Sequence, residues 1–186
     1  MIDVHCHILP DVDDGPKSWE ASEEMCRMAR ADGIEHIVAT PHANDRYHYD
    51  RPYLSGLLDQ FWQRVGKFPR MTLGCDFHLS YENFQDLIVA PAKYCIEGTQ
   101  YVLVELSNYS IPPQIDECFF KMHEKGIIPV ITHPERNPIL QQNPERVLAW
   151  AEMRCVVQVT ASSVTGFWGE RAWRATQFLL KHKAVH

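Results

Sequence analysis

Short apolar runs alternate with amphipathic stretches along the whole chain. The apolar runs predict buried strands at IDVH (2–5), IEHIVAT (34–40), MTLGC (71–75), YVLVELS (101–107), IIPVITH (127–133) and CVVQVTA (155–161). The amphipathic stretches predict helices at residues 19–33, 52–66, 113–126, 144–153 and 169–182. Residues 76–100 show the weakest pattern, and we expect a short helix and a loop there.

The predicted strands are continuous apolar runs rather than alternating apolar and polar positions. This pattern is typical of parallel strands that helices cover on both faces. No glycine-rich nucleotide fingerprint follows the first strand, so the succession of strands suits a barrel better than an open sheet. We therefore predict an α/β protein with a barrel-like parallel sheet, folded as a single domain over residues 1–186.

Composition and charge narrow the class of protein. The chain is 45% hydrophobic and 23% charged, as in an ordinary globular protein, and its net charge of −6 offers no basic surface for nucleic acid. No apolar stretch is long enough to span a bilayer, and the first residues lack a signal peptide, which predicts a cytoplasmic location. The six cysteines are scattered without CxxC spacing, which favours reduced thiols over disulfides.

Side chains that can bind metal ions lie at the ends of five successive predicted strands. They are His5 and His7 on the first strand, His42 after the second, Asp76 at the third, Glu105 on the fourth and His133 at the fifth. Barrel enzymes assemble their sites at the carboxyl ends of several strands, so we expect these side chains to gather. Residues two apart on a strand point to the same side, so His5 and His7 can bind one ion while Cys6 faces away.

The mixture of imidazoles and carboxylates predicts the kind of metal site. It suits Zn, Mn or Fe, and without clustered thiolates it does not resemble a structural zinc site. The number of ligands exceeds what one ion needs, so we expect two or three divalent ions. Such sites cleave phosphate esters, because they activate water and stabilise both the attacking and the leaving oxygen.

Two further residues complete the candidate site. Arg136 follows His133 in HPERN and can clamp phosphate oxygens, but an arginine that pairs with an acid on the surface has the same sequence signature. Among Asp11, Asp13 and Asp14 we expect one ligand, with the others shaping the loop or supporting the ligands. A Gly-Pro turn directly after Asp14 makes Asp14 the best placed of the three.

Together these motifs resemble one known family. HCH…DVDDG, TPH, LGCD, LVELS, THPERN and QVTASSVTGFWG extend over essentially the whole chain and are similar to the polymerase and histidinol phosphatase (PHP) superfamily. Within it, the chain most resembles the bacterial metal-dependent protein tyrosine phosphatases of the CpsB/YwqE type from capsule biosynthesis. HxH alone is common, whereas its combination with DVDDGPKS, THPERN and the S-x-x-G-x-x-G block is specific.

The resemblance implies a fold, a cofactor and a reaction. The fold is a distorted (β/α)7 TIM-like barrel, and the cofactor is a cluster of two or three divalent ions, Mn with Fe or Zn as alternatives. The reaction is hydrolysis of phosphotyrosine by a metal-bound hydroxide, on the tail of a bacterial tyrosine kinase that controls exopolysaccharide export. The resemblance implies that His5, His7, Asp14, His42, Glu105 and His133 are ligands and that Arg136 binds phosphate. We add Asp76 as a seventh ligand, and we expect Arg136 and Asp14 to be the catalytic residues.

Two features depart from the family pattern. Asp76 stands where the family usually has a glutamate, and its shorter side chain requires a closer backbone or weakens the hold on one ion. The chain ends at KHKAVH, where the family continues through a last strand to an Asp-x-His pair of ligands. We therefore expect this chain to be part of a longer protein, with a barrel that lacks its C-terminal strand. No pattern in the sequence indicates the oligomeric state.

Two alternatives stay open on the sequence alone. The chain could act on a small molecule such as histidinol phosphate, or it could be a degenerate metal-binding module without turnover. A cysteine-based phosphatase needs a C-x5-R loop, and no cysteine here has an arginine six positions later. That absence argues against a covalent phosphocysteine mechanism.

Overall fold

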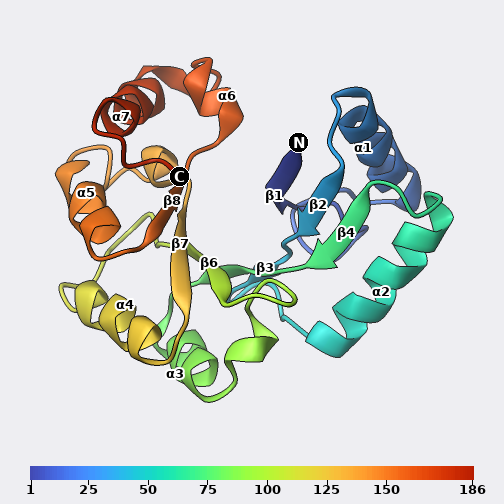
Figure 1. Ribbon diagram of the computed structural model, residues 1–186, viewed down its shortest axis with the longest axis horizontal. Helices are drawn as coiled ribbons and strands as arrows, with labels where there is room; N and C mark the ends of the chain where they lie inside the picture. Colours follow the sequence, from blue (N-terminus) through green and yellow to red (C-terminus); the bar gives the residue numbers. More distant parts are fainter. The chain divides into compact units, whose positions relative to one another are not determined.

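The computed structural model describes all 186 residues (Figure 1). They form two compact units, Met1–Val102 and Leu103–His186, and the boundary falls within one strand. Strands and helices alternate along the chain in both units. None of the helices combines the length and the apolar character that a bilayer crossing requires.

Unit 1 contains two sets of parallel strands. β1 (Ile2–Cys6), β2 (His36–Ala39) and β4 (Arg70–Leu73) form a sheet in the order β1-β2-β4, and β3 (His42–Ala43) pairs with β5 (Asp76–His78). The helices are α1 (Trp19–Ala31), α2 (Arg51–Arg64) and α3 (Tyr81–Val89), followed by a 3-10 turn, η1 (Pro91–Lys93). In Figure 1, α1 and α2 lie alongside the β1-β2-β4 sheet.

Short polar side chains start the three helices of unit 1. Ser18, Asp50 and Ser80 are the N-caps, and each accepts a hydrogen bond from the backbone N–H three residues later. α1 ends just before Gly33, whose φ of 77° is the left-handed conformation that favours glycine. These local signals fix where each helix begins and ends, and so where the loops that carry polar residues can lie.

The core of unit 1 is built on its central strand. Ile37, Val38 and Ala39 of β2 are buried in succession, as the continuous apolar run predicts, and Phe61 of α2 is fully buried. Full burial of one such large apolar side chain contributes about 1.5–3 kcal/mol. This packing holds the strand ends, and the polar residues attached to them, in defined positions.

Unit 2 contains three adjacent strands in the order β6-β7-β8: β6 (Tyr101–Glu105), β7 (Ile128–Thr132) and β8 (Val156–Gln158). β7 and β8 run parallel. The helices are α4 (Ile115–Glu124), α5 (Glu145–Glu152), the short α6 (Ala161–Val164) and α7 (Gly169–Lys181), and a 3-10 turn, η2 (Pro134–Arg136), follows β7.

The core of unit 2 combines buried strands with an aromatic pair. Val104 and Ile131 are fully buried on β6 and β7. Phe119 of α4 meets Trp150 of α5 edge to face, with ring centroids 5.4 Å apart. Trp150 Nε1 also donates a hydrogen bond to Asp116 Oδ1 at 2.7 Å, so its polar edge is satisfied as its ring packs.

The predicted α/β arrangement with parallel strands is confirmed, and several short elements, among them β5 and α6, differ from expectation. Asp76 does not end the third predicted strand, because β4 stops at Leu73 and Asp76 opens the separate strand β5. The chain leaves β4 at Gly74, where a Cβ would lie 3.0 Å from Val38 Cγ1, so the turn runs close against β2. The helix α6 escapes the hydrophobic pattern because four residues are too few to show a period.

Candidate metal centre

Unit 1 collects polar residues at the ends of three strands. His5 lies on β1 and His7 follows that strand, while His42 opens β3 and Asp76 opens β5. His42 and Asp76 are paired neighbours in the parallel β3–β5 ladder. Asp76 is fully buried, and a buried carboxylate is costly unless partners compensate its charge. The three surrounding imidazoles supply such partners.

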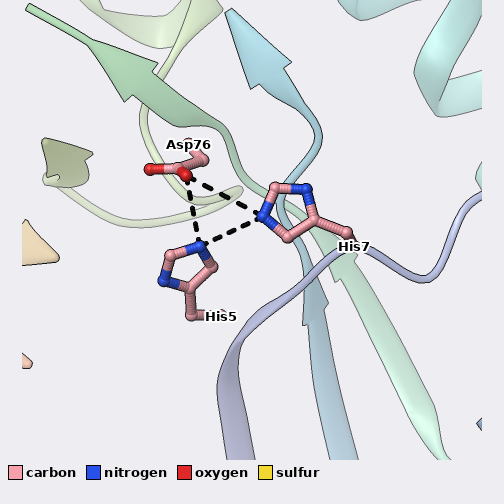
Figure 2. A group of neighbouring side chains, drawn as sticks. All are labelled: His5, His7 and Asp76. Atoms are coloured by element: carbon pink, nitrogen blue, oxygen red, sulfur yellow. Dashed lines mark hydrogen bonds and ion pairs between the residues drawn. The ribbon is translucent and has the colours of Figure 1, made fainter. Parts of the chain in front are cut away.

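The imidazoles of His5 and His7 point toward the Asp76 carboxylate (Figure 2). Asp76 Oδ2 lies 3.3 Å from His5 Nε2 and 3.8 Å from His7 Nε2, and the two Nε2 atoms are 3.3 Å apart. Two atoms that bind one ion at about 2.1 Å are about 3.0 Å apart at a right angle and about 3.4 Å apart at a tetrahedral angle. Two of the three separations fall in this range, and the third, from His7 Nε2 to Asp76 Oδ2, is longer at 3.8 Å, so a shared divalent ion fits with a small adjustment of one side chain.

His42 extends this cluster toward Asp14. His42 Nδ1 lies 3.3 Å from Asp76 Oδ2, and His42 Nε2 lies 3.4 Å from Asp14 Oδ1. The donor atoms of His7, Asp14 and His42 all lie within 4.8 Å of one another, as do those of His5, His7 and Asp76. The cluster thus offers adjacent groups of donors, which is the arrangement that more than one ion requires.

Asp13 orients this cluster from behind. It is 3% exposed, its Oδ2 lies 2.8 Å from His7 Nδ1, and the same oxygen accepts a hydrogen bond from the backbone N–H of His42 at 3.1 Å. An ionised carboxylate only accepts hydrogen bonds, so the proton of a neutral His7 resides on Nδ1. The lone pair on Nε2 then faces Asp76, as a metal ligand must.

The charges around Asp13 support this assignment. Burial raises the pKa of Asp13, but its hydrogen bond with His7, the charge of His7 and the N–H groups of Gly15 and His42 bring it below the usual value. Burial lowers the pKa of His7, and the neighbouring carboxylates outweigh that effect and raise it. Asp13 therefore carries its negative charge at neutral pH, which makes His7 a more basic ligand.

The loop after β1 turns Asp13 inward and leaves Asp14 at the rim. Gly15 N donates to Asp13 Oδ1 at 2.9 Å, and a Cβ at Gly15 would lie only 2.5 Å from His7 O. Only glycine permits this close backbone approach. The Asp14 side chain is 62% exposed, so its carboxylate is open to solvent while it faces the imidazoles.

Unit 2 holds the remaining predicted residues around one pocket. Glu105 is the last residue of β6, His133 follows β7, and Arg136 ends η2. All three line a pocket of about 180 Å³, together with Trp168. Its walls present a carboxylate, an imidazole and a guanidinium, so the pocket can receive a cation, an anion or both together.

Hydrogen bonds brace the η2 turn on both sides. Glu135 is buried, and its Oε1 accepts hydrogen bonds from Thr160 N at 3.0 Å and from Ser163 Oγ at 2.7 Å. Asn137 Nδ2 donates to Leu106 O at 3.1 Å. The turn that carries the pocket residues is therefore fixed to its neighbours rather than left as a free loop.

Within each unit, the structure brings the predicted residues together. Unit 1 gathers five of them (His5, His7, Asp14, His42 and Asp76), and unit 2 gathers three (Glu105, His133 and Arg136). The alternative for Arg136, a surface arginine that pairs with an acid, finds no support in the contacts of this side chain. Its side chain is half-buried and stacks on Trp168, and no ion pair joins it to a carboxylate.

Two residues of the site stand outside the predicted ligand set. Asp13 has a weak sequence signal, because DVDDG places it beside Asp14 and only the loop conformation decides which acid turns inward. Trp168 lies in QVTASSVTGFWG, one of the motifs that carry the family resemblance, but that motif does not reveal its contact with Arg136, which joins segments more than thirty positions apart. Neither hydrophobic period nor ligand spacing reports such a pairing.

The cysteines offer no activated nucleophile. All six are free thiols. Burial raises the pKa of each of them, that of Cys155 to about 12. Since the thiolate is the attacking species, this agrees with the lack of a C-x5-R loop.

The whole chain matches known proteins. The family model described as capsular polysaccharide synthesis, CpsB/CapC, covers residues 1–186. The tyrosine-protein phosphatase YwqE of Bacillus subtilis is 34% identical over 190 residues, which are 100% of this chain and 74% of that protein. The tyrosine-protein phosphatase CpsB of Streptococcus pneumoniae is 28% identical over 197 residues, which are 100% of this chain and 80% of that protein.

A solved structure is similar over the same length. It is one of the crystal structures of YwqE from Bacillus subtilis and CpsB from Streptococcus pneumoniae, which are described as metal-dependent tyrosine phosphatases. The match has a TM-score of 0.91 and 33% identity, and it covers 100% of this chain and 76% of the other.

Proposed function

Because the chain belongs to the CpsB/CapC family of capsular polysaccharide synthesis, we propose that it is a metal-dependent phosphatase that hydrolyses phosphotyrosine in proteins. The observation that carries the proposal is the convergence of His5, His7 and His42 on the buried Asp76 carboxylate. A carboxylate surrounded by imidazoles is a set of donors for divalent ions. The relatives of this chain are named as tyrosine-protein phosphatases.

In this proposal two or three divalent ions bind the chain, with Mn expected and Fe or Zn as alternatives. The ligands in unit 1 are His5, His7, Asp14, His42 and Asp76, and those in unit 2 are Glu105 and His133. When bound, such ions supply Lewis-acid chemistry, because they lower the pKa of water and stabilise charge on phosphoryl oxygens.

The side chains of the protein bind the substrate and handle its protons. Arg136 holds the phosphoryl oxygens through its guanidinium N–H groups, a planar donor fork that matches a phosphate. The exposed Asp14 carboxylate accepts the proton of the attacking water. The water oxygen bonds to phosphorus as the bond from phosphorus to the tyrosine oxygen breaks. The leaving tyrosine oxygen takes a proton from solvent and departs as the phenol, and Asp14 then releases to solvent the proton that it accepted.

Several finer points belong to the same proposal. The substrate is the tail of a bacterial tyrosine kinase, as the resemblance implies. A cytoplasmic location accords with six unpaired thiols, since disulfides are rare in reducing compartments. The parallel strands belong to a single domain over residues 1–186 with the distorted (β/α)7 barrel of PHP proteins, in keeping with strand and helix alternation in both units.

Chelation followed by metal replacement tests the proposal. We expect exhaustive chelation to abolish hydrolysis of a phosphotyrosine peptide, and added Mn²⁺ to restore it. His42→Ala should abolish the restored activity, whereas His36→Ala should keep it, because His36 contacts Thr72 and lies outside the cluster. Activity that survives chelation would overturn the metal mechanism.

A substrate panel separates the proposed reaction from its rivals. Phosphotyrosine peptides should be cleaved faster than sugar, nucleotide and amino-alcohol phosphates at equal concentration. A preference for one of the small phosphates would point to a small-molecule phosphatase. Ions bound in stoichiometric amounts without turnover of any substrate would indicate a metal-binding module.

A further inference from the structure

The guanidinium of Arg136 lies over the face of an indole. Its central carbon is 3.9 Å from the centroid of the Trp168 ring. Both side chains line the same pocket in unit 2. A cation over an aromatic face is attracted by the ring quadrupole, and the attraction is strongest for tryptophan.

The indole itself is held in place by Ser162 of α6. Trp168 Nε1 donates a hydrogen bond to Ser162 Oγ at 2.9 Å, so the ring is fixed at its polar edge. Phe167 meets it edge to face, with ring centroids 5.5 Å apart and an interplanar angle of 88°. The face that Arg136 uses is therefore a fixed platform rather than a freely rotating side chain.

Neighbouring residues join the same two segments a second time. Glu135, next to Arg136, accepts hydrogen bonds from Thr160 N and Ser163 Oγ, and Ser163 follows the Ser162 that anchors the indole. The η2 turn and the start of α6 are thus tied both by a buried carboxylate and by the stacked pair. The hydrogen bonds of Glu135 fix the backbone beside Arg136, and the contact with Trp168 fixes the Arg136 side chain.

The stacked guanidinium keeps its donors available. Arg136 makes no ion pair with a carboxylate, and its side-chain N–H groups donate to no protein atom. Stacking uses the face of the guanidinium, whereas its N–H groups point outward in the plane, so the contact does not compete with binding an anion. Holding a long side chain in one orientation also reduces the entropy that is lost when a ligand binds.

We propose that Trp168 is the positioning residue that holds the Arg136 guanidinium ready to bind the phosphoryl group. This inference rests on the proposed function, in which Arg136 binds the phosphoryl oxygens. Trp168 acts through Arg136 and touches no reacting atom. Its loss should therefore weaken phosphate binding while the ions and the proton-accepting carboxylate keep their places.

The test compares two tryptophans of similar exposure. Trp168→Leu removes the aromatic face, and Trp173→Leu on α7 is the matched control, because Trp173 is 43% exposed against 45% for Trp168 and does not line the pocket. We expect Trp168→Leu to lower kcat/KM for a phosphotyrosine peptide by about 3- to 30-fold, or about 0.7–2 kcal/mol, chiefly through KM. Trp168→Phe should recover most of this loss, and Trp173→Leu should match the wild type.

A double-mutant cycle decides whether Trp168 acts through Arg136. In an Arg136→Ala background, Trp168→Leu should cause little further loss, because the side chain that it positions is gone. An equal loss in both backgrounds, or an equal loss from Trp173→Leu, would show that Trp168 serves only the general fold and would overturn the inference.

A binding measurement separates this inference from the proposed function. Calorimetric titration of the Mn-loaded protein with inorganic phosphate needs no turnover, and Trp168→Leu should raise the phosphate Kd by the same factor as it lowers kcat/KM. If the wild type cleaves no aryl phosphate but the phosphate Kd still rises, the proposed function fails and the role of Trp168 stands. An unchanged phosphate Kd would refute that role.

Discussion

Replacing Asp13 with asparagine is the sharpest test of how the metal centre is organised. The side chain is buried and keeps nearly the same shape in Asp13→Asn, but it loses the charge that faces His7 Nδ1 at 2.8 Å. An amide can also present its NH2 group to His7, which would favour the wrong tautomer and move the lone pair away from Asp76. The change therefore disturbs the ligand without removing it.

The expected size of the effect follows from two independent estimates. A hydrogen bond to a charged group contributes about 1.5–3 kcal/mol, which corresponds to about a 10- to 150-fold change in an equilibrium constant. Loss of a residue that orients a metal-bound histidine typically costs about 10- to 100-fold in metal affinity or activity. The two ranges overlap, so we expect Asp13→Asn to weaken metal binding by about 10- to 100-fold.

The assay is a metal titration of the chelated protein, followed by calorimetry and by hydrolysis of a phosphotyrosine peptide. Asp11→Asn is the matched control, because Asp11 lies in the same loop, is exposed, and has a φ of 55° that asparagine tolerates well. Wild-type metal affinity in Asp13→Asn, or the same loss in both variants, would refute the reasoning. Thermal unfolding of the chelated proteins would reveal whether a loss arises from misfolding instead.

Three further predictions concern the loop, the thiols and the core. Gly15→Ala should weaken metal binding and lower the melting temperature, because the new Cβ would lie 2.5 Å from His7 O. Gly56→Ala in α2 should raise the melting temperature, because its new Cβ meets no atom within 4 Å and alanine favours a helix. Calorimetry measures both effects. Iodoacetamide at pH 8 should leave phosphatase activity intact, because burial raises the pKa of every thiol, including that of Cys155 to about 12, and rapid inactivation would contradict this. Phe61→Ala should reduce the free energy of unfolding by about 3–5 kcal/mol in urea titrations, and a loss below about 1 kcal/mol would show that the site collapses around the cavity.

The hydrophobic pattern predicts much of the fold, because burial of continuous strands is a local property of the sequence. The runs at 34–40 and 127–133 become β2 and β7, and each end of the two strands lies within two residues of its predicted position. The meeting of His5 and His7 also follows from the two-residue period of an extended strand. Both results depend only on geometry within a few residues.

Features that depend on distant segments could not be predicted in this way. The switch from β4 to β5 places Asp76 beside His42, and it is set by close packing at Gly74 rather than by hydrophobicity. The inward turn of Asp13 depends on the loop backbone, and the stacking of Trp168 on Arg136 depends on tertiary packing. In each case, the missing information is which two segments touch.

The ring of imidazoles around Asp76 also has a consequence for competition among the ions of the cell. Magnesium and calcium are abundant, but both prefer oxygen ligands, and calcium takes six to eight of them. His5, His7 and His42 present nitrogen at the positions nearest to the carboxylate, so these hard cations find few of the oxygens that they need. Scarcer transition-metal ions bind nitrogen more strongly, and the cluster can therefore select them against a large excess of magnesium.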